Sequence, residues 1–362
     1  MSFTIRGLAT AVPDLVVSRE ESVHIAKILC GPSMTETDWV QSVYDNSGVM
    51  FRHQVIGQAV VDDLMAGTRN SGSVFLPSDD RQGPTTEQRM KIYADEAPPL
   101  ALEAAREAIL DAGVPAQSIT HLVTVSCTGF VAPGIDIALI KKLGLSPTVQ
   151  RVHVGFMGCQ GAINGLRVAS GFTNSNPNAV VLLVAVELCS LHYYYGGEPS
   201  KVVANALFAD GAAAIVGTSG GAGWRVVDTG SCLIPDSQRE MGWVIGNHGF
   251  HMTLTKQIPK LIAANLRSWL EGWLDEHHLT IENVGAWAVH PGGPRILAAV
   301  EESLCLPATA LDTSRRILSE NGNMSSPTVL FILNQMRRDE AEGPIVVLGF
   351  GPGLIAEVAL VE

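Results

Sequence analysis

Short runs of apolar residues alternate along the chain with segments in which apolar residues recur every three or four positions. The apolar runs predict buried strands near the N-terminus and at residues 121–126, 148–156, 179–186, 212–217, 224–229, 285–289, 345–350 and 354–361. Helical spacing covers residues 99–112, 133–143, 160–171 and 257–276. Strands that alternate with helices on this scale predict an α/β fold, in which helices cover a mostly parallel sheet.

The series of strands and helices runs twice along the chain, and glycine-rich turns begin near Gly220, where the sequence changes character. We therefore predict two halves, residues 1–220 and residues 221–362. Residues 57–88 are polar and contain only one short apolar stretch, so we predict that they form a mobile loop.

The charge and the length of the apolar runs exclude several classes of protein. The chain of 362 residues has 24 Lys and Arg residues against 36 Asp and Glu residues, which gives a formal net charge of −12. This acidity disfavours a nucleic-acid partner, and an anionic substrate would need a local basic patch. The longest apolar run, residues 179–186, is too short to span a membrane.

The cysteines and histidines show no metal-binding spacing. The six cysteines form no CxxC pair, and the N-terminus lacks the pattern of a secretory signal. We therefore expect free thiols in a cytoplasmic protein. His277 and His278 lie beside two acidic residues and are expected at a solvated helix end, so no metal is predicted.

Cys159 is the first candidate for chemistry. It follows an apolar strand and precedes a helix of small residues, in the sequence GFMGCQGAIN. The N–H groups at a helix N-terminus favour a thiolate, so we expect a lowered pKa for this thiol. Gly158 and Gly161 leave room for a substrate carbonyl beside it. The alternative is a buried cysteine that acts as a small hydrophobic residue.

His290 and Asn323 are the second and third candidates. His290 ends a predicted strand and opens the sequence HPGGPR, and Asn323 lies in the turn sequence ENGNMSS. Each residue alone is typical of a hydrogen-bonded turn. Together with Cys159 they form a Cys–His–Asn set, in which the cysteine carries an acyl group and the other two donate hydrogen bonds to an oxyanion. Papain-like proteases also use this set, but their cysteine signature is absent here.

Several motifs resemble those of the type III polyketide synthases, the chalcone-synthase-like branch of the thiolase superfamily. They are GCQGA, HPGGPRI, GNMSS, GFGPG, TTEQRM, CTGF, PSKVV and ALFADGAA. The resemblance covers nearly the whole chain and implies a thiolase-like fold, in which two similar βαβαβαββ halves form a five-layered αβαβα core. It also implies a homodimer that needs no cofactor besides its CoA substrates. GFGPG leads into a strand, which argues against dinucleotide binding.

The resemblance also implies a reaction. Cys159 would accept an acyl group from an acyl-CoA, and malonyl-CoA would then lose CO₂ to give an enolate that extends the chain. His290 and Asn323 would hold the thioester oxygen, and Phe208 would separate the CoA tunnel from the cavity. Repeated extension and cyclisation would give a pyrone or an aromatic product. The stretch MGWVIGNHGF is similar to bacterial members that make alkylpyrones, alkylresorcinols or tetrahydroxynaphthalene.

Further positions match residues that bind substrate or shape the product in this family. They are Cys127, Thr128, His192, Trp243, Met252, Gly292, Arg295 and Ser325. His192 is unusual, because smaller residues are typical there. It could orient an intermediate or be hydrogen-bonded within the wall. Ala132 falls where many relatives place a methionine that reaches the partner subunit.

One departure concerns the phosphates of CoA, which plant-like relatives bind through a basic cluster near the N-terminus. The matching residues 39–46 contain no Lys or Arg. Other cations could serve, and the candidates are Arg52, Lys201, Lys256 and Arg295. The starter could also arrive on a carrier protein. Two alternatives stay open: a single-round condensing enzyme similar to ketoacyl synthase III, and a non-catalytic acyl-binding partner of the same fold.

Overall fold

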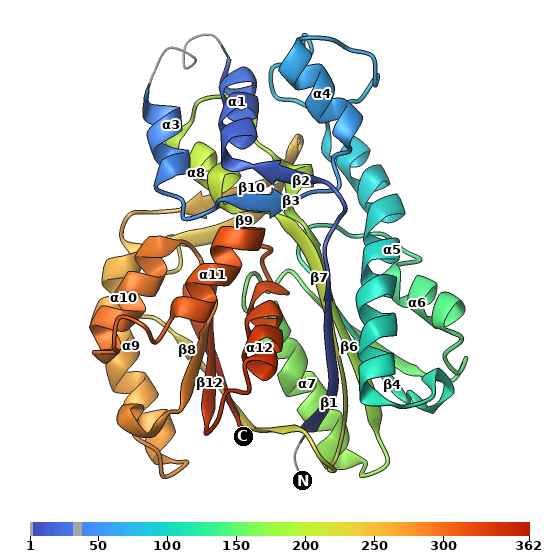
Figure 1. The fold of residues 1–362 in the computed structure, drawn as a ribbon, viewed down its shortest axis with the longest axis vertical. Helices are drawn as coiled ribbons and strands as arrows, with labels where there is room; N and C mark the ends of the chain where they lie inside the picture. The colour runs from blue at the N-terminus through green and yellow to red at the C-terminus, as the bar shows by residue number, and fades with distance from the viewer. Residues whose placement is uncertain (1–2, 32–37) are drawn as a thin grey trace.

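The computed structural model describes residues 3–31 and 38–362 (Figure 1). The elements up to Thr218 are β1 Phe3–Ala11, β2 Val16–Ser18, α1 Arg19–Cys30, α3 Asp38–Asp45, β3 Phe51–His53, α4 Gln58–Ala66, α5 Thr86–Ala112, β4 His121–Ser126, α6 Ile135–Leu143, β5 Gln150–Gly155, α7 Gly161–Ser175, β6 Val180–Leu188, α8 Pro199–Leu207 and β7 Asp210–Thr218. The later elements are β8 Trp224–Leu233, β9 Met241–Gly246, β10 Gly249–Leu254, α9 Ile258–Asp275, β11 Ala286–Val289, α10 Pro294–Leu304, α11 Asp312–Asn321, α12 Thr328–Arg338, β12 Ile345–Gly351 and β13 Ile355–Val361. The predicted strands and helices are present, with ends that differ by a few residues in most cases.

One nine-stranded sheet runs through the molecule in the order β11-β12-β13-β8-β1-β7-β6-β4-β5. Thr4 of β1 pairs with Thr218 on one side and with Arg225 on the other, so β1 connects the two parts of the sheet. The prediction of a mostly parallel sheet is wrong, because only β4–β5, β4–β6 and β11–β12 are parallel. β12 returns directly into β13 through a tight turn, which forces an antiparallel pair.

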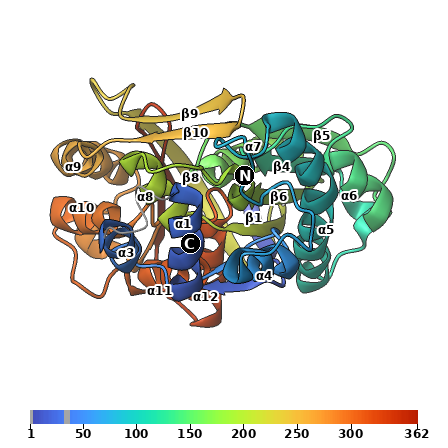
Figure 2. The same ribbon diagram turned by 90° about the horizontal axis from the view of Figure 1, so that it is seen from above.

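The sheet and its helices form the five layers that the resemblance implies. α5 and α6 cover the outer face of the first part, and α9 and α10 cover the outer face of the second (Figure 2). The two parts diverge in Figure 1 with α7 and α12 between them. In each part a first strand pairs with the last, and β8, β11, β12 and β13 repeat the sheet positions of β1, β4, β6 and β7. Only β5 has no counterpart in the second part.

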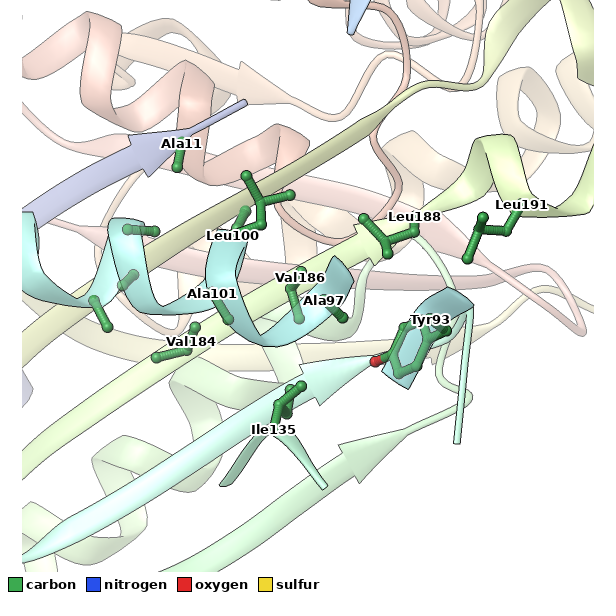
Figure 3. Close-up of a cluster of buried hydrophobic side chains, with 14 of the residues drawn as sticks. Ala11, Tyr93, Ala97, Leu100, Ala101, Ile135, Val184, Val186, Leu188 and Leu191 are labelled. Atoms are coloured by element: carbon green, nitrogen blue, oxygen red, sulfur yellow. The ribbon is translucent and has the colours of Figure 1, made fainter. Parts of the chain in front are cut away.

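Small residues bring the layers close together. Figure 3 shows Ala97 and Ala101 of α5 packed beside Val184 and Val186 of β6. A Cβ atom on Gly7 of β1 would lie 2.2 Å from a backbone oxygen of α5, so only glycine allows this approach. Burial of apolar surface on both faces of the sheet holds the molecule together.

The prediction of a mobile loop at residues 57–88 is wrong at both ends. α4 occupies its first part, and α5 begins at Thr86, well before the predicted start at residue 99. Thr85 and Gln88 form a capping box that starts α5, which continues through Pro98 and Pro99. Between the helices, Asp63 accepts hydrogen bonds from the backbone N–H groups of residues 70 and 71. No helix among the described residues is long and apolar enough to cross a membrane.

Candidate active site

Cys159 lies in the turn that connects β5 to α7, next to the residue that caps the helix, Gln160. Gly158 has a φ of +89°, and a Cβ atom on it would lie 2.2 Å from Cδ of Pro352. Glycine is therefore required where this turn meets the GFGPG segment. The turn lies at the carboxyl ends of the parallel strands β4, β5 and β6, which is where α/β folds place ligands.

Asn323 reaches Cys159 from the second half of the chain. Its backbone N–H donates to the carbonyl of Leu207, and its own carbonyl accepts from the N–H of Ala209, both at 2.9 Å. Its side-chain Oδ1 accepts a hydrogen bond from the N–H of Ser325 at 2.8 Å. Against the effect of burial, hydrogen bonding from the side chains of Ser325 and Asn323 lowers the pKa of the Cys159 thiol. Because the N–H of Ser325 occupies the amide oxygen of Asn323, the NH₂ group remains as the donor of this side chain.

His290 directly follows the carboxyl end of β11. Its backbone N–H donates to the carbonyl of Leu348 on β12, and the next residue, Gly349, packs on Gln160 beside Cys159. The residue is 1% exposed, and neither ring nitrogen has a hydrogen-bond partner in the part of the chain that the structure describes. Buried polar atoms without partners are rare and costly, so this imidazole is a candidate for contact with a substrate.

The pKa values of the two groups are set mainly by burial. Burial raises the pKa of the Cys159 thiol to about 12, although hydrogen bonds from Ser325 and Asn323 lower it. Burial lowers the pKa of His290 to about 3. The prediction of a lowered thiol pKa at a helix N-terminus is therefore wrong, because the loss of water around the sulfur outweighs the helix. Both groups are neutral at physiological pH.

A cavity opens beside Cys159, and the cavity and its mouth together hold about 760 Å³ of empty space. The predicted residues that line it are Cys127, Thr128, Cys159, His192, Phe208, Trp243, Met252 and Ser325. Four other predicted residues, His290, Gly292, Arg295 and Asn323, are not part of this lining. Arg295 is exposed at the start of α10, so a contact between its side chain and substrate stays a prediction.

His192 belongs to the wall of the cavity. Its Nε2 is 2.7 Å from the carbonyl of Thr128, and its Nδ1 accepts a hydrogen bond from the N–H of Phe250. Its ring stacks on Phe250 with centroids 4.2 Å apart and meets Trp243 edge-on. Burial lowers the pKa of His192 to about 3, so the ring is neutral. Because both ring nitrogens are engaged, the structure favours a wall residue over one that removes a proton from an intermediate.

Glu187 is a residue of the site that sequence reasoning missed. It ends the apolar strand β6 and is fully buried, and its Oε2 accepts from the N–H of Cys127 and the hydroxyl of Thr128, both at 2.8 Å. Its Oε1 accepts from the hydroxyl of Ser326. Burial raises the pKa of Glu187 to about 7, and the carboxylate in turn raises the pKa of Cys159. A single acidic residue within the run VVLLVAVEL was the signal in the sequence.

The four candidate cations for the CoA phosphates differ in their burial and in whether they line the cavity. Arg52 is buried and donates hydrogen bonds to the carbonyls of Asn205, Ala206 and Phe208, so its selection as a phosphate ligand is wrong. Lys256 is exposed and, like Arg295, does not line the cavity. Lys201 does line it. The described residues contain no cluster of His, Cys, Asp and Glu that could hold a metal ion.

This five-layered fold, with a buried cysteine at the carboxyl ends of parallel strands and beside a cavity, is that of an acyltransferase of the thiolase-like class. Residues 3–220 match the N-terminal domain of the chalcone and stilbene synthases, and residues 226–362 match their C-terminal domain. The chain belongs to this family and is a type III polyketide synthase.

Relatives and solved structures agree with this assignment. The chain is 40% identical to 1,3,6,8-tetrahydroxynaphthalene synthase of Streptomyces peucetius subsp. caesius, over 99% of this chain and 93% of that protein. It is 32% identical to the alpha-pyrone synthesis polyketide synthase-like Pks18 of Mycobacterium tuberculosis (strain ATCC 25618 / H37Rv), over 99% and 90%. The crystal structure of PKS-I from the brown alga Ectocarpus siliculosus superposes with a TM-score of 0.92 at 31% identity, covering 100% of this chain and 98% of that one.

Proposed function

We propose that the protein extends an acyl-CoA starter with malonyl-CoA units on Cys159, and then cyclises the chain to a pyrone or an aromatic ring. The observation that carries this proposal is Cys159 itself, a thiol that lines one cavity and whose pKa is raised by burial and lowered by the side chains of Ser325 and Asn323. A buried thiol with a fixed amide beside it can both carry an acyl group and stabilise negative charge on a thioester oxygen.

The first step loads the starter. The thiol of Cys159 attacks the thioester carbonyl of the acyl-CoA, and the neutral imidazole of His290 takes the thiol proton. A new bond forms between the sulfur and the acyl carbon, and the bond from that carbon to the CoA sulfur breaks. The proton passes from His290 to the departing CoA thiolate. Burial lowers the pKa of His290 to about 3, so its imidazole is neutral and has an unprotonated nitrogen for this proton.

The second step extends the chain. The thioester oxygen of malonyl-CoA accepts hydrogen bonds from His290 and from the amide of Asn323 while the bond to the carboxylate breaks and CO₂ leaves. The resulting enolate attacks the acyl carbon on Cys159, and the cysteine sulfur is released as a thiolate. Asn323 suits this role, because the N–H of Ser325 fixes its oxygen and leaves its NH₂ group for the substrate. The Cys159 thiolate then attacks the thioester carbonyl of the extended chain, the bond to the CoA sulfur breaks and CoA leaves, so that the chain is again carried on Cys159 for the next round.

Incubation with malonyl-CoA and a panel of short, aromatic and long acyl-CoA starters, with the products identified by mass, tests the proposal. We expect products that contain at least two malonyl-derived units and a ring. A product extended only once and released as a β-ketoacyl thioester would instead indicate a single-round condensing enzyme. No turnover with any starter, together with tight acyl-CoA binding, would indicate an acyl-binding partner.

The active form that we propose is a cytoplasmic homodimer. β5 is an edge strand of the sheet, and exposed apolar residues gather at and beside it: Phe130, Val131, Val152 and Met157. An unpaired strand edge with exposed apolar residues needs a cover in a stable protein. Ala132, which is exposed in the same loop as Phe130, would then face the partner. Substitution of Val152 by Lys should convert the dimer to a monomer in sedimentation experiments, and a dimer that persists would contradict this interface.

A further inference from the structure

We infer that Lys201 holds a phosphate of the phosphopantetheinyl arm of the substrate at the mouth of the cavity. This inference rests on the proposed function, because it assigns a part of the substrate to a part of the same cavity. Residues 39–46 lack the basic cluster, and a single cation on α8 would take over its role.

The residues on one face of α8 give the distance between the reaction centre and Lys201. Lys201, Ala204, Asn205 and Phe208 all line the cavity, and they stand at positions i, i+3, i+4 and i+7. Phe208 is bridged to Asn323, so this end of the face lies at the catalytic residues. With a rise of 1.5 Å per residue, Lys201 lies roughly 10 Å further along the helix axis. At that distance it can meet the remote end of a substrate arm but not the reacting carbons.

The opposite face of α8 fixes the helix in place. Val202 and Ala206 are buried in a separate apolar cluster with Val40 and Tyr44 of α3, and Figure 1 shows the two helices side by side. Arg52 caps the C-terminal end of α8 through the carbonyls of its last residues. Packing on the opposite face therefore holds the backbone of α8 in place, and with it the Cα atom of Lys201.

The ammonium group of Lys201 has two side-chain partners. Its Nζ lies 4.0 Å from the centroid of the Tyr194 ring and 2.9 Å from Oε2 of Glu198. His251, which also lines the cavity, meets the Tyr194 ring edge-on. The side chain of Lys201 is 21% exposed, whereas that of Glu198 is 50% exposed. An anionic ligand can therefore displace Glu198 into solvent while the Tyr194 ring continues to support the ammonium group.

Lys201 matters for an anionic substrate because the chain as a whole is acidic. The net charge is −12, and the sequence has no Lys or Arg between Lys27 and Arg52. Arg52 itself is occupied by backbone carbonyls inside the protein. Lys201 is the only Lys or Arg among the described residues that line the cavity. A single cation at the mouth of a cavity in an acidic protein raises the local concentration of a phosphorylated substrate.

The test compares Lys201→Met with the wild type on two substrates that share one acyl group. Acyl-CoA carries the phosphates, and the matching acyl-pantetheine lacks them. We expect the variant to raise KM for acyl-CoA by roughly fivefold or more, the scale of one charge-assisted contact in a partly buried site, with KM for acyl-pantetheine and kcat unchanged. The matched control is Lys142→Met, which removes an exposed lysine from α6 far from the cavity.

A second substitution should change KM for acyl-CoA in the opposite direction. Glu198→Gln frees Lys201 from its ion pair, so KM for acyl-CoA should fall below the wild-type value. The same pair of variants, assayed with the acyl group on the phosphopantetheine of a carrier protein, distinguishes the two sources of the phosphate. The source whose KM responds to Lys201→Met is the one that this lysine binds.

Three results would overturn the inference. Equal increases of KM for acyl-CoA and acyl-pantetheine would show that Lys201 only shapes the cavity. Unchanged KM values in Lys201→Met, for CoA-bound and carrier-bound substrates alike, would show that another group holds the phosphate. A higher KM for acyl-CoA in Glu198→Gln would contradict competition between carboxylate and phosphate. If the wild-type protein forms no polyketide from any substrate, it is the proposed function that fails, because the inference concerns only how KM depends on the phosphates.

Discussion

Substitution of Glu187 by Gln should make the free energy of unfolding less sensitive to pH between 5 and 7.5. Burial raises the pKa of this carboxyl group from 4.5 to about 7, although hydrogen bonds from Ser326, Cys127 and Thr128 lower it. In this pH window the folded protein therefore keeps a proton that the unfolded chain releases. Because the folded state binds more protons, the wild type loses stability as pH rises from 4.5 towards 7, and the loss is complete above 7.

The size of the effect follows from the same pKa. A rise from 4.5 to about 7 corresponds to roughly 3 kcal/mol at 1.36 kcal/mol per pH unit. Roughly 2 kcal/mol of this falls between pH 5 and pH 7.5. Glutamine can keep the hydrogen bonds. Its oxygen can accept from Cys127 and Thr128, and its amide can donate to the hydroxyl of Ser326. The variant therefore removes the titration and leaves the packing in place.

Urea unfolding of the wild type and Glu187→Gln at pH 5 and pH 7.5 measures this difference. Between the two pH values, the variant should gain about 2 kcal/mol relative to the wild type. Glu107→Gln removes the same charge from an exposed position on α5, and should stay within about 0.5 kcal/mol of the wild type at both pH values. If Glu187→Gln followed the wild type at both pH values, the carboxyl group would not titrate in this window, and the reasoning from its burial would be refuted.

Three further substitutions test the geometry of the site. Gly158→Ala should nearly abolish condensation, because a residue with φ of +89° would place its Cβ 2.2 Å from Pro352; wild-type turnover would show that this turn can relax. Arg52→Met should lower the free energy of unfolding by about 1–3 kcal/mol or more, since it leaves buried carbonyls without their donor, and an unchanged denaturation midpoint would contradict this. Asn323→Ala should lower malonyl-CoA decarboxylation by roughly 10²–10³-fold while Cys159 still accepts an acyl group, and undiminished CO₂ release would remove Asn323 from the proposed step.

The apolar pattern of the sequence predicted most of the strands, because runs of apolar residues occur where strands are buried. It did not predict strand direction, since apolar runs look alike in parallel and antiparallel neighbours. It also missed the first half of α5, where Pro98 and Pro99 suggested a helix start but lie inside the helix. The interpretation of residues 57–88 as polar overlooked the apolar residues 59–61 and 64–66, which lie in α4. Val60 and Leu64 of this helix pack against the core.

The site was predictable where local turn chemistry places a residue, and unpredictable where burial decides its properties. Cys159 and Asn323 lie on glycine-bounded turns, and the structure brings them into contact across the two halves. The pKa of the Cys159 thiol depends on how much water the folded chain removes, and a helix-terminus argument cannot supply that. Arg52 illustrates the same limit, because a sequence shows a cation but not the carbonyls that occupy it.

The most direct test of the central claim is to locate the acyl group on the protein. Three cysteines, Cys127, Cys159 and Cys189, line the same cavity, so the position of the adduct separates the proposed nucleophile from its neighbours. Asn323→Ala is incubated with an acyl-CoA, digested and mapped by mass spectrometry. We expect one acyl group, carried on the Cys159 peptide and absent after Cys159→Ala. An adduct on Cys127 or Cys189, or full polyketide production by Cys159→Ala, would contradict the role of Cys159 as the nucleophile.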